Sequence, residues 1–407
     1  MRRARLAALS LSCLWAAASC SAEITLETCD IRQSDCQRNV FLAVQEVRGG
    51  LWDPWLELPP MRVIGTEQYR AELELSRRRA AEGERPYDYL TPALKLLHMI
   101  DPDEPPQGAT DFSVSFVAAY YDSFLRSVTI IDRGARTDQR EDVRTLAHEL
   151  VHAAQERDIG FATFDDWISS LDSANAVGSL IEGEAMLYEN LVDAKQRSLD
   201  PETINWKGYH AGWIASTRER ILKDASPFRI ASSGLRYPLG SRYLVSAYLE
   251  GAQLGVRRAL AAHPGATSQL MAGRHTEQDR APDAWSCAYP APPEAYTRVK
   301  DDELGGYSLY AFATRLFPDD EARAWELASA WNGDRFLIYA DEGKQLGVLW
   351  MLRLRTAEAA SSLQRALTDN PLAASIVSER QGERLHLFVA SQGLADYAEW
   401  RSCKPAP

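Results

Sequence analysis

The chain has 407 residues, of which 45% are hydrophobic and 25% are charged. This is the composition of an ordinary globular protein, and the length leaves room for two domains. The formal net charge of -12 and a pI near 5.2 argue against a polyanionic partner, because nucleic-acid-binding proteins usually carry a basic face that neutralises phosphates. We therefore expect no nucleic acid among the partners of this protein.

The first twenty residues have the features of a secretory signal. Three arginines are followed by an apolar run too short for a stable membrane anchor, and then by the small residues of "AAASC". This end resembles a bacterial lipobox, in which Cys20 would become the lipidated first residue and anchor the protein to a membrane. Plain cleavage after Ala22 is the alternative. We expect residues 1–20 to be a signal peptide, and the mature protein to be a lipoprotein of the bacterial cell envelope or a secreted protein.

Four more cysteines follow the predicted signal: Cys29, Cys36, Cys287 and Cys403. An exported chain meets an oxidising compartment, so this even number predicts two disulfides. The spacing favours a local bridge between Cys29 and Cys36 and a second bridge between Cys287 and Cys403 that closes the C-terminal part. Four cysteines allow three connectivities, so the pairing stays open at this point.

The predicted elements are mostly helical along the first two thirds of the chain. From Cys29 to Glu84 helical periodicity is interrupted by a loop and short strand, and the short helix "YLTPALKLLHMI" follows. Residues 112–133 are rich in β-branched and aromatic side chains around "YDSFLRS", which predicts a β-hairpin. Further helices are expected in the motif segment, near residues 173–197 and 203–223, and as a pair in "PLGSRYLVSAYLEGAQLGVRRALAAHP".

The last 120 or so residues alternate helix and strand after a proline-rich stretch near Ala281. We therefore predict an α+β, mainly helical chain, with one domain over residues 21–283 and a C-terminal α+β unit over residues 284–407 that closes on the cleft. Within that unit, "WNGDRFLIY" suggests a buried ion pair between Asp334 and Arg335 beside Trp331.

The segment "TLAHELVHAAQE" carries the clearest chemical pattern. His148 and His152 are one helical turn apart, so their rings emerge on one face and can share a metal ion, while Glu149 can act as general base. The alternative is an ordinary amphipathic helix that happens to carry two histidines. On this helix Gln155 is expected to face solvent. Glu182 in "SLIEGEAMLYEN" is the candidate third ligand, and two histidines, one carboxylate and an open position describe a catalytic zinc site.

Other side chains are candidates for supporting roles. Glu189, seven residues after Glu182, returns to the ligand face of its helix and could support the first histidine. A hydrolase of this kind usually needs a donor that stabilises the oxyanion. The candidates for that donor are His275, His210, Tyr188, Tyr209 and Tyr237. His98 and His386 lie in apolar runs and are expected to be core or interface residues.

"TLAHELVHAAQE" followed by "LIEGEA" resembles a family of secreted or lipoprotein-type bacterial zinc metallopeptidase-like proteins of the gluzincin kind, whose zinc motif is similar to that of thermolysin. "VRGGLW", "AAYYDSFLRSVTI", "YPLGSRYLVSAYLEGA", "ATSQL" and "ASAWNGDRFLIY" resemble elements of that family in the same order, over about residues 40–370. The resemblance implies a zincin-like peptidase domain with an edge strand, here within residues 114–131, that lines the substrate cleft. It also implies that Zn²⁺ is bound by His148, His152 and Glu182. Met186 departs from the pattern, because thermolysin-like sites have an aspartate at that position.

These features predict a zinc-dependent hydrolase, and specifically a peptidase that acts on a peptide or protein substrate. Glu149 would take a proton from the attacking water. The alternative is a surface lipoprotein that keeps the metallopeptidase fold without activity and works by binding a partner. The intact Glu149 counts against this alternative, since a site that only binds needs no base there.

Overall fold

The computed structural model describes most of the chain, and the following account concerns that part alone. The described residues are 29–49, 57–82, 87–104, 117–134, 138–273, 287–288, 295–391 and 404–405. The predicted signal, Cys20, His275 and Cys403 lie outside these residues. None of the helices in the described part is both long and apolar enough to cross a membrane.

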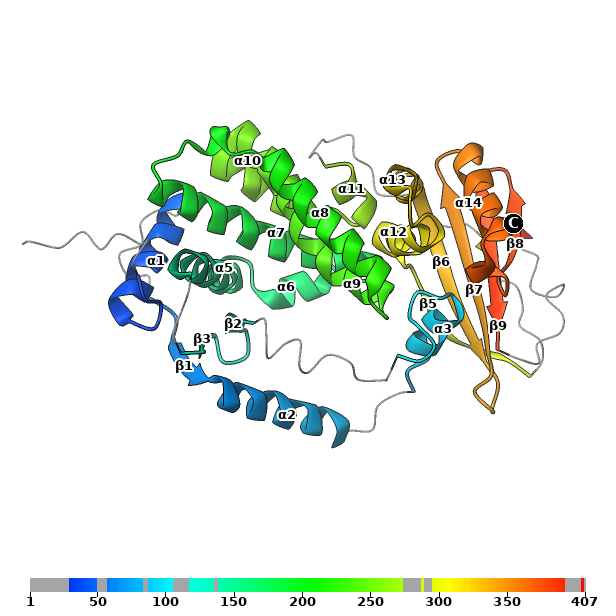
Figure 1. Cartoon of the computed structure of the whole chain (residues 1–407), viewed down its shortest axis with the longest axis horizontal. Helices are drawn as coiled ribbons and strands as arrows, with labels where there is room; N and C mark the ends of the chain where they lie inside the picture. The colour runs from blue at the N-terminus through cyan, green and yellow to red at the C-terminus, as the bar shows by residue number, and fades with distance from the viewer. Residues whose placement is uncertain are drawn as a thin grey trace, which may run out of the picture.

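The chain is α+β and mostly helical, as the sequence predicts. A helical half, at the left of Figure 1, surrounds two long neighbouring helices, α5 and α7. Asp138 caps the start of α5 with its side chain, and a capping box of Ser170 and Ser173 starts α7. The helices of this half are α1 (Ser34–Val47), α5 (Gln139–Asp158), α6 (Phe161–Asp166), α7 (Leu171–Gln196), α8 (Trp206–Lys223), α9 (Pro227–Gly234), α10 (Arg236–Ala261) and α11 (Thr267–Met271).

The structure adds two features to the predicted helices, a break within α10 and a close contact between α10 and α7. The expected helix pair after residue 237 is α10, whose two parts meet at a break where Ala252 adopts a φ of 47°. Along its first part α10 approaches α7 closely, because Gly240 and Gly183 leave no side chains between the backbones. A Cβ on Gly240 would lie 1.7 Å from the carbonyl oxygen of Ser179. Glycine is therefore required for this contact.

A three-stranded sheet lies beside α5. The predicted hairpin is β2 (Ala119–Asp122) paired antiparallel with β3 (Ser127–Asp132), and the strand order β1-β3-β2 leaves β2 at the edge. The strand β1 (Met61–Gly65) pairs parallel with β3 and leads directly into α2 (Thr66–Glu82). The hairpin prediction is thus confirmed for residues 119–132, while its first residues, 112–116, lie outside the described part. The short helix predicted before the hairpin is α3 (Leu90–Leu96).

The C-terminal part is built on a five-stranded antiparallel sheet, at the right of Figure 1, with strand order β5-β6-β7-β9-β8. Its elements are β5 (Thr297–Asp302), α12 (Gly305–Leu316), α13 (Glu321–Ser329), β6 (Trp331–Ala340), β7 (Leu346–Leu354), α14 (Ala357–Asp369), β8 (Val377–Gln381) and β9 (Arg384–Ala390). Two short 3₁₀ helices, Pro201–Thr203 and Pro371–Ala373, complete the helical elements of the described residues.

One buried apolar cluster continues from the helical half into the C-terminal part. It includes residues as far apart as Ile31 and Val389. The helix α12 lies at its centre, with Gly305–Thr314 buried at every position, and packs on α7, α8 and α9 on one side and on β6 on the other. The core thus crosses residue 283, the boundary expected between the two domains, without interruption. The division into two domains stays a prediction.

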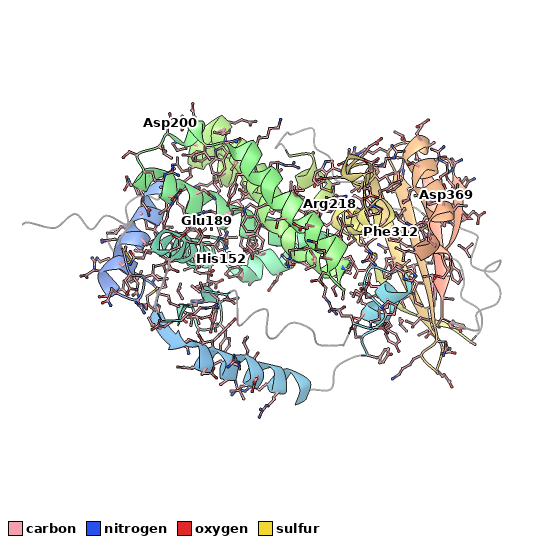
Figure 2. All side chains as sticks on the ribbon, in the orientation of Figure 1. His152, Glu189, Asp200, Arg218, Phe312 and Asp369 are labelled. Atoms are coloured by element: carbon pink, nitrogen blue, oxygen red, sulfur yellow. A yellow bond between two sulfur atoms is a disulfide. The ribbon has the colours of Figure 1, made fainter. Side chains whose placement is uncertain are left out.

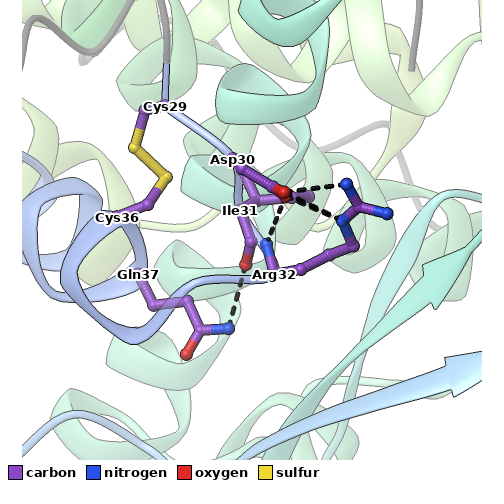
Figure 3. The surroundings of a disulfide bond; sticks show 6 residues. All are labelled: Cys29, Asp30, Ile31, Arg32, Cys36 and Gln37. Atoms are coloured by element: carbon purple, nitrogen blue, oxygen red, sulfur yellow. Dashed lines mark hydrogen bonds and ion pairs between the residues drawn. A yellow bond between two sulfur atoms is a disulfide. The ribbon is translucent and has the colours of Figure 1, made fainter. Parts of the chain in front are cut away.

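The N-terminal disulfide prediction is confirmed, because Cys29 and Cys36 are bridged at the start of α1. Figure 3 shows how the short loop between them is held: Arg32 pairs with Asp30, and the side-chain amide of Gln37 donates to a backbone carbonyl of the loop. The second predicted bridge lies outside the described side chains. The backbones of its two segments are paired antiparallel as β4 (Cys287–Ala288) and β10 (Lys404–Pro405).

The predicted ion pair of Asp334 with Arg335 is wrong. Neighbouring residues of a strand point to opposite faces, so Arg335 pairs instead with Asp301 and Glu303. The buried carboxylate of Asp334 accepts from the backbone N–H groups of residues 304 and 305 and from the indoles of Trp331 and Trp350. Its role is to hold the start of α12 against β6. His98 and His386, expected to be core or interface residues, are half-buried.

Candidate metal centre

Three side chains from α5 and α7 converge in the helical half. His148 and His152 project from the same face of α5 toward Glu182 of α7. The Nε2 atoms of His148 and His152 lie 3.2 and 3.6 Å from Glu182 Oε2, and the ligand atoms of the three residues lie within 4.8 Å of one another. Figure 2 labels His152 on α5 and Glu189 on α7, in the helical half of the molecule.

The triad has the donors that zinc prefers, and the distances from Glu182 to the two histidines are close to those of a tetrahedral site. Imidazole nitrogen and carboxylate oxygen bind Zn²⁺ at about 2.0–2.2 Å, so neighbouring ligand atoms in a tetrahedral site stand roughly 3.3–3.5 Å apart. The two distances to Glu182 Oε2 bracket this value closely. Three protein ligands leave a fourth position for water or substrate, which is typical of catalytic zinc sites.

The outer nitrogen of His148 contacts a carboxylate that an arginine holds in place. His148 Nδ1 lies 2.9 Å from Glu189 Oε2, and Glu189 Oε1 accepts from Arg144 at 2.9 Å. Arg144 also reaches Asn190 and the hydroxyl of Tyr209. The structure thus brings Glu189 to the first histidine, where the seven-residue spacing from Glu182 places it. A carboxylate on the outer nitrogen directs the lone pair of Nε2 toward the metal position.

The outer nitrogen of His152 contacts an amide that the sequence analysis placed in solvent. Gln155 is fully buried, with 0% exposure, and its Oε1 lies 2.8 Å from His152 Nδ1. The expectation that Gln155 faces solvent is therefore wrong, because α7 packs over this side of α5. Its three-residue spacing from His152 on a helix was the signal that could have indicated the contact. Likewise, Arg144 precedes His148 by four residues on α5, and this spacing could have indicated that the two side chains are neighbours.

Glu149 is held beside the triad by the edge strand. The backbone N–H of Tyr121 in β2 donates to Glu149 Oε2 at 2.8 Å. Burial raises the pKa of Glu149, although the nearby His152 and His148 act in the opposite direction. The carboxylate therefore lies close enough to both histidines for their charges to lower its pKa.

The three residues of the triad shift one another's pKa values. Burial lowers the pKa of His148, but contacts with Glu182 and Glu189 more than offset this and leave that pKa well above its ordinary value. Burial alone would raise the pKa of Glu182, yet the two histidines lower it far below its usual range. The two histidines therefore favour the ionised form of Glu182 when they carry positive charge. When the histidines are neutral, a divalent cation bound by the triad supplies that positive charge instead.

Among the candidates for an oxyanion donor, the structure places Tyr237 at the triad. Burial raises the pKa of Tyr237, as do the carboxylates of Glu182 and Glu149 near its hydroxyl, and its ring stacks on His148 with the ring centres 6.0 Å apart. The close approach of α10 to α7 through Gly240, one turn after Tyr237, allows this contact. Trp213 of α8, 44% exposed, stacks on Tyr237 at 6.3 Å.

The remaining candidates have other partners in the structure. His210 is buried between α8 and α10, where its Nε2 contacts the hydroxyl of Ser241 and burial lowers its pKa to about 4. Tyr188 lies on the side of α7 away from the ligand, since six residues turn a helix by about 240°, and there its ring packs under Arg48. Tyr209 bonds to Asn190 and Arg144, and His275 lies outside the described residues.

Comparison of the chain with models of protein families, with characterised proteins and with solved structures gives no match.

Proposed function

We propose that this protein is an exported zinc-dependent peptidase with a gluzincin-type ligand set and a zincin-like catalytic domain. The observation that carries the proposal is the convergence of His148 Nε2, His152 Nε2 and Glu182 Oε2 beside Glu149. A purely structural metal site would be closed by a fourth protein ligand and would need no adjacent carboxylate.

The residues of the site divide the work of hydrolysis among them. Zn²⁺, when bound to the triad, would polarise the scissile carbonyl and lower the pKa of the attacking water to about 7. Glu149 accepts the proton of that water and returns it to the leaving amine, and the N–H of Tyr121 keeps the carboxylate oriented during both transfers. The buried surroundings of Glu149 suit this role, since they keep bulk water from competing for the proton.

Tyr237 is the best-placed donor for the oxyanion. Its pKa is raised by burial and by the nearby charges of Glu182 and Glu149, and stacking on His148 limits how far the ring can turn. A preorganised phenol of this kind stabilises negative charge as it develops on the carbonyl oxygen. The exposed indole of Trp213 beside Tyr237 offers an apolar surface that a substrate side chain can cover.

The edge strand β2 supports a peptide as the substrate. Peptide groups along an antiparallel strand point alternately toward the partner strand and away from it. The N–H of Tyr121 points away from β3 toward Glu149, so the peptide groups of Ala119, two residues earlier, also lie on the free edge. An extended peptide that adds to this edge would run past the base and the triad, as in other cases of strand addition.

The export part of the proposal is supported by the disulfide between Cys29 and Cys36. Such bridges persist in oxidising compartments and are rare in the reducing cytosol. The signal-like residues 1–20 and the lipobox-like Cys20 favour the same conclusion.

Three variants test the proposal on the purified mature protein. We expect the wild type to bind one zinc per chain, and we expect His148→Ala and Glu182→Ala to lose stoichiometric zinc in elemental analysis. Glu149→Gln should keep zinc but lose turnover on a peptide library. Glu67→Gln, the same chemical change at an exposed position of α2, is the matched control and should cleave like wild type.

Cleavage by metal-verified Glu149→Gln at the wild-type rate would remove Glu149 from the mechanism. Zinc binding without any chelator-sensitive cleavage would favour the alternative of a binding protein with this fold. A wild-type chain that binds no zinc would refute the proposal as a whole.

A further inference from the structure

A line of hydrogen bonds runs from the end of α1 to the outer nitrogen of His152. Arg48, directly after α1, donates to Glu184 Oε1 at 2.7 Å. Glu184 Oε2 accepts from Gln155 Nε2 at 2.9 Å, and Gln155 Oε1 lies 2.8 Å from His152 Nδ1. Glu184 and Gln155 are buried, with 1% and 0% exposure. Three separate helices thus contribute to a line that ends on one candidate zinc ligand.

The partners of Gln155 fix which end of its amide faces His152. Its Nε2 donates both to Glu184 and to the backbone carbonyl of Ile181, at 2.9 Å each. A carbonyl oxygen can only accept, so the NH₂ group must lie on that side. Oxygen Oε1 therefore faces His152, and Nδ1 of His152 must carry the hydrogen. This leaves the lone pair on Nε2, the nitrogen that faces Glu182.

The charge of Glu184 explains why Arg48 belongs to the line. A buried carboxylate without a partner is unfavourable, and removal of one member of such a pair is strongly destabilising. Only 10% of the Arg48 side chain is exposed, and it lies over the ring of Tyr188 with its guanidinium carbon 5.5 Å from the ring centre. Without Arg48, Glu184 would turn toward water, and Gln155 would lose the acceptor that orients it.

We propose that Arg48, Glu184 and Gln155 are positioning residues that set the zinc affinity of the site by holding His152 from behind. This inference rests on the proposed function and adds residues that the motif does not contain. The outer partners of the two histidines differ. His148 Nδ1 contacts the carboxylate of Glu189, whereas His152 Nδ1 contacts the neutral amide of Gln155. The ion pair of Arg48 and Glu184 lies behind that amide. Outer partners of this kind typically change metal affinity 10–100-fold when they are removed.

Zinc affinity of the metal-free full-length mature protein, measured by competition with a chromophoric chelator, tests this line. We expect Gln155→Leu and Arg48→Met to weaken zinc binding by about 10–100-fold. Arg48→Lys should restore part of the loss, because lysine keeps the charge. The visible spectrum of the Co²⁺-loaded protein should change in Gln155→Leu, since it reports how the histidine is oriented. If Gln155→Leu fails to fold, Glu184→Gln keeps the shape of its side chain and should weaken binding in the same direction.

Asp158→Asn is the matched control. Asp158 is the second ion-pair partner of Arg48, at 3.0 Å, but its side chain is 41% exposed and does not belong to the line of contacts that leads to Gln155. Its zinc affinity should stay within about twofold of wild type. Wild-type affinity in folded Gln155→Leu and Arg48→Met, or an equal loss in Asp158→Asn, would overturn the inference while leaving the proposed function intact. A wild type that binds no zinc would overturn both.

Discussion

Replacing Gly240 by alanine tests how the site depends on the contact between α7 and α10. The added Cβ would lie 1.7 Å from the carbonyl oxygen of Ser179, whereas a C–H group and a carbonyl oxygen normally stay about 3.3 Å apart. The backbones must therefore separate by about 1.5 Å. Alanine improves helix propensity by about 1 kcal/mol, but overpacking against rigid backbone costs 1–3 kcal/mol or more. We expect Gly240→Ala to lower the free energy of unfolding by about 2 kcal/mol.

The same displacement should reach the catalytic groups. Tyr237 is one turn before Gly240 on α10, and Gly183, which faces Gly240, is next to Glu182. A shift of 1 Å in such positions costs roughly 100-fold in rate. We expect kcat/KM on a peptide substrate to fall by about that factor, with zinc still bound. Urea unfolding followed by circular dichroism measures the stability, and initial rates measure the activity.

Gly212→Ala provides the matched control. Gly212 is exposed on α8, and a Cβ there would meet no atom within 4 Å. This variant should gain up to about 1 kcal/mol of stability and keep full activity. If Gly240→Ala unfolds at the same urea concentration as wild type, the backbones of α7 and α10 are not in contact as described, and the placement of Tyr237 fails with them.

Three other predictions follow from the site, the buried charges and the disulfide. Tyr237→Phe should keep zinc and lower kcat about 100-fold or more, and a change of less than threefold would exclude its phenol as oxyanion donor. Burial raises the pKa of Asp172 to about 8, above its ordinary value near 3.8, so the folded state holds a proton that the unfolded chain releases. Stability should therefore fall as pH rises from about 4 to about 8, and this slope in urea midpoints should become shallower in Asp172→Asn. Paired replacement of Cys29 and Cys36 by serine should cost about 2 kcal/mol, measured by thermal unfolding, and no change would show that the loop needs no bridge.

Local pattern was sufficient to predict the elements that hold the ligands. The helical period around residues 173–197 predicted α7 nearly to its ends, and the β-branched and aromatic residues around "YDSFLRS" predicted the hairpin. The four-residue spacing of His148 and His152 needs only a helix to bring both rings to one face. Glu182 could likewise be predicted as the third ligand from its position on α7, once α7 is assumed to pack on α5.

Contacts between distant segments could not be predicted in this way. Arg48 meets Glu184 across 136 residues of chain, and nothing in the sequence marks this arginine among many others. Tyr188, Tyr209 and Tyr237 were equivalent candidates until the fold placed one of them on the ligand. Gln155 was assigned to solvent because polar residues usually face water, and only the packing of α7 over it reverses that expectation.

The continuous core around α12 has a consequence for how the protein melts. Since α12 contacts both α7, which carries Glu182, and the strand β6, neither part can lose its structure without exposing the apolar surface of the other. We expect one cooperative calorimetric transition for the described part of the chain. A ligand that binds only the folded state raises the stability of everything that unfolds with it. Zinc taken up between α5 and α7 should therefore also protect the amides of the distant five-stranded sheet from hydrogen exchange.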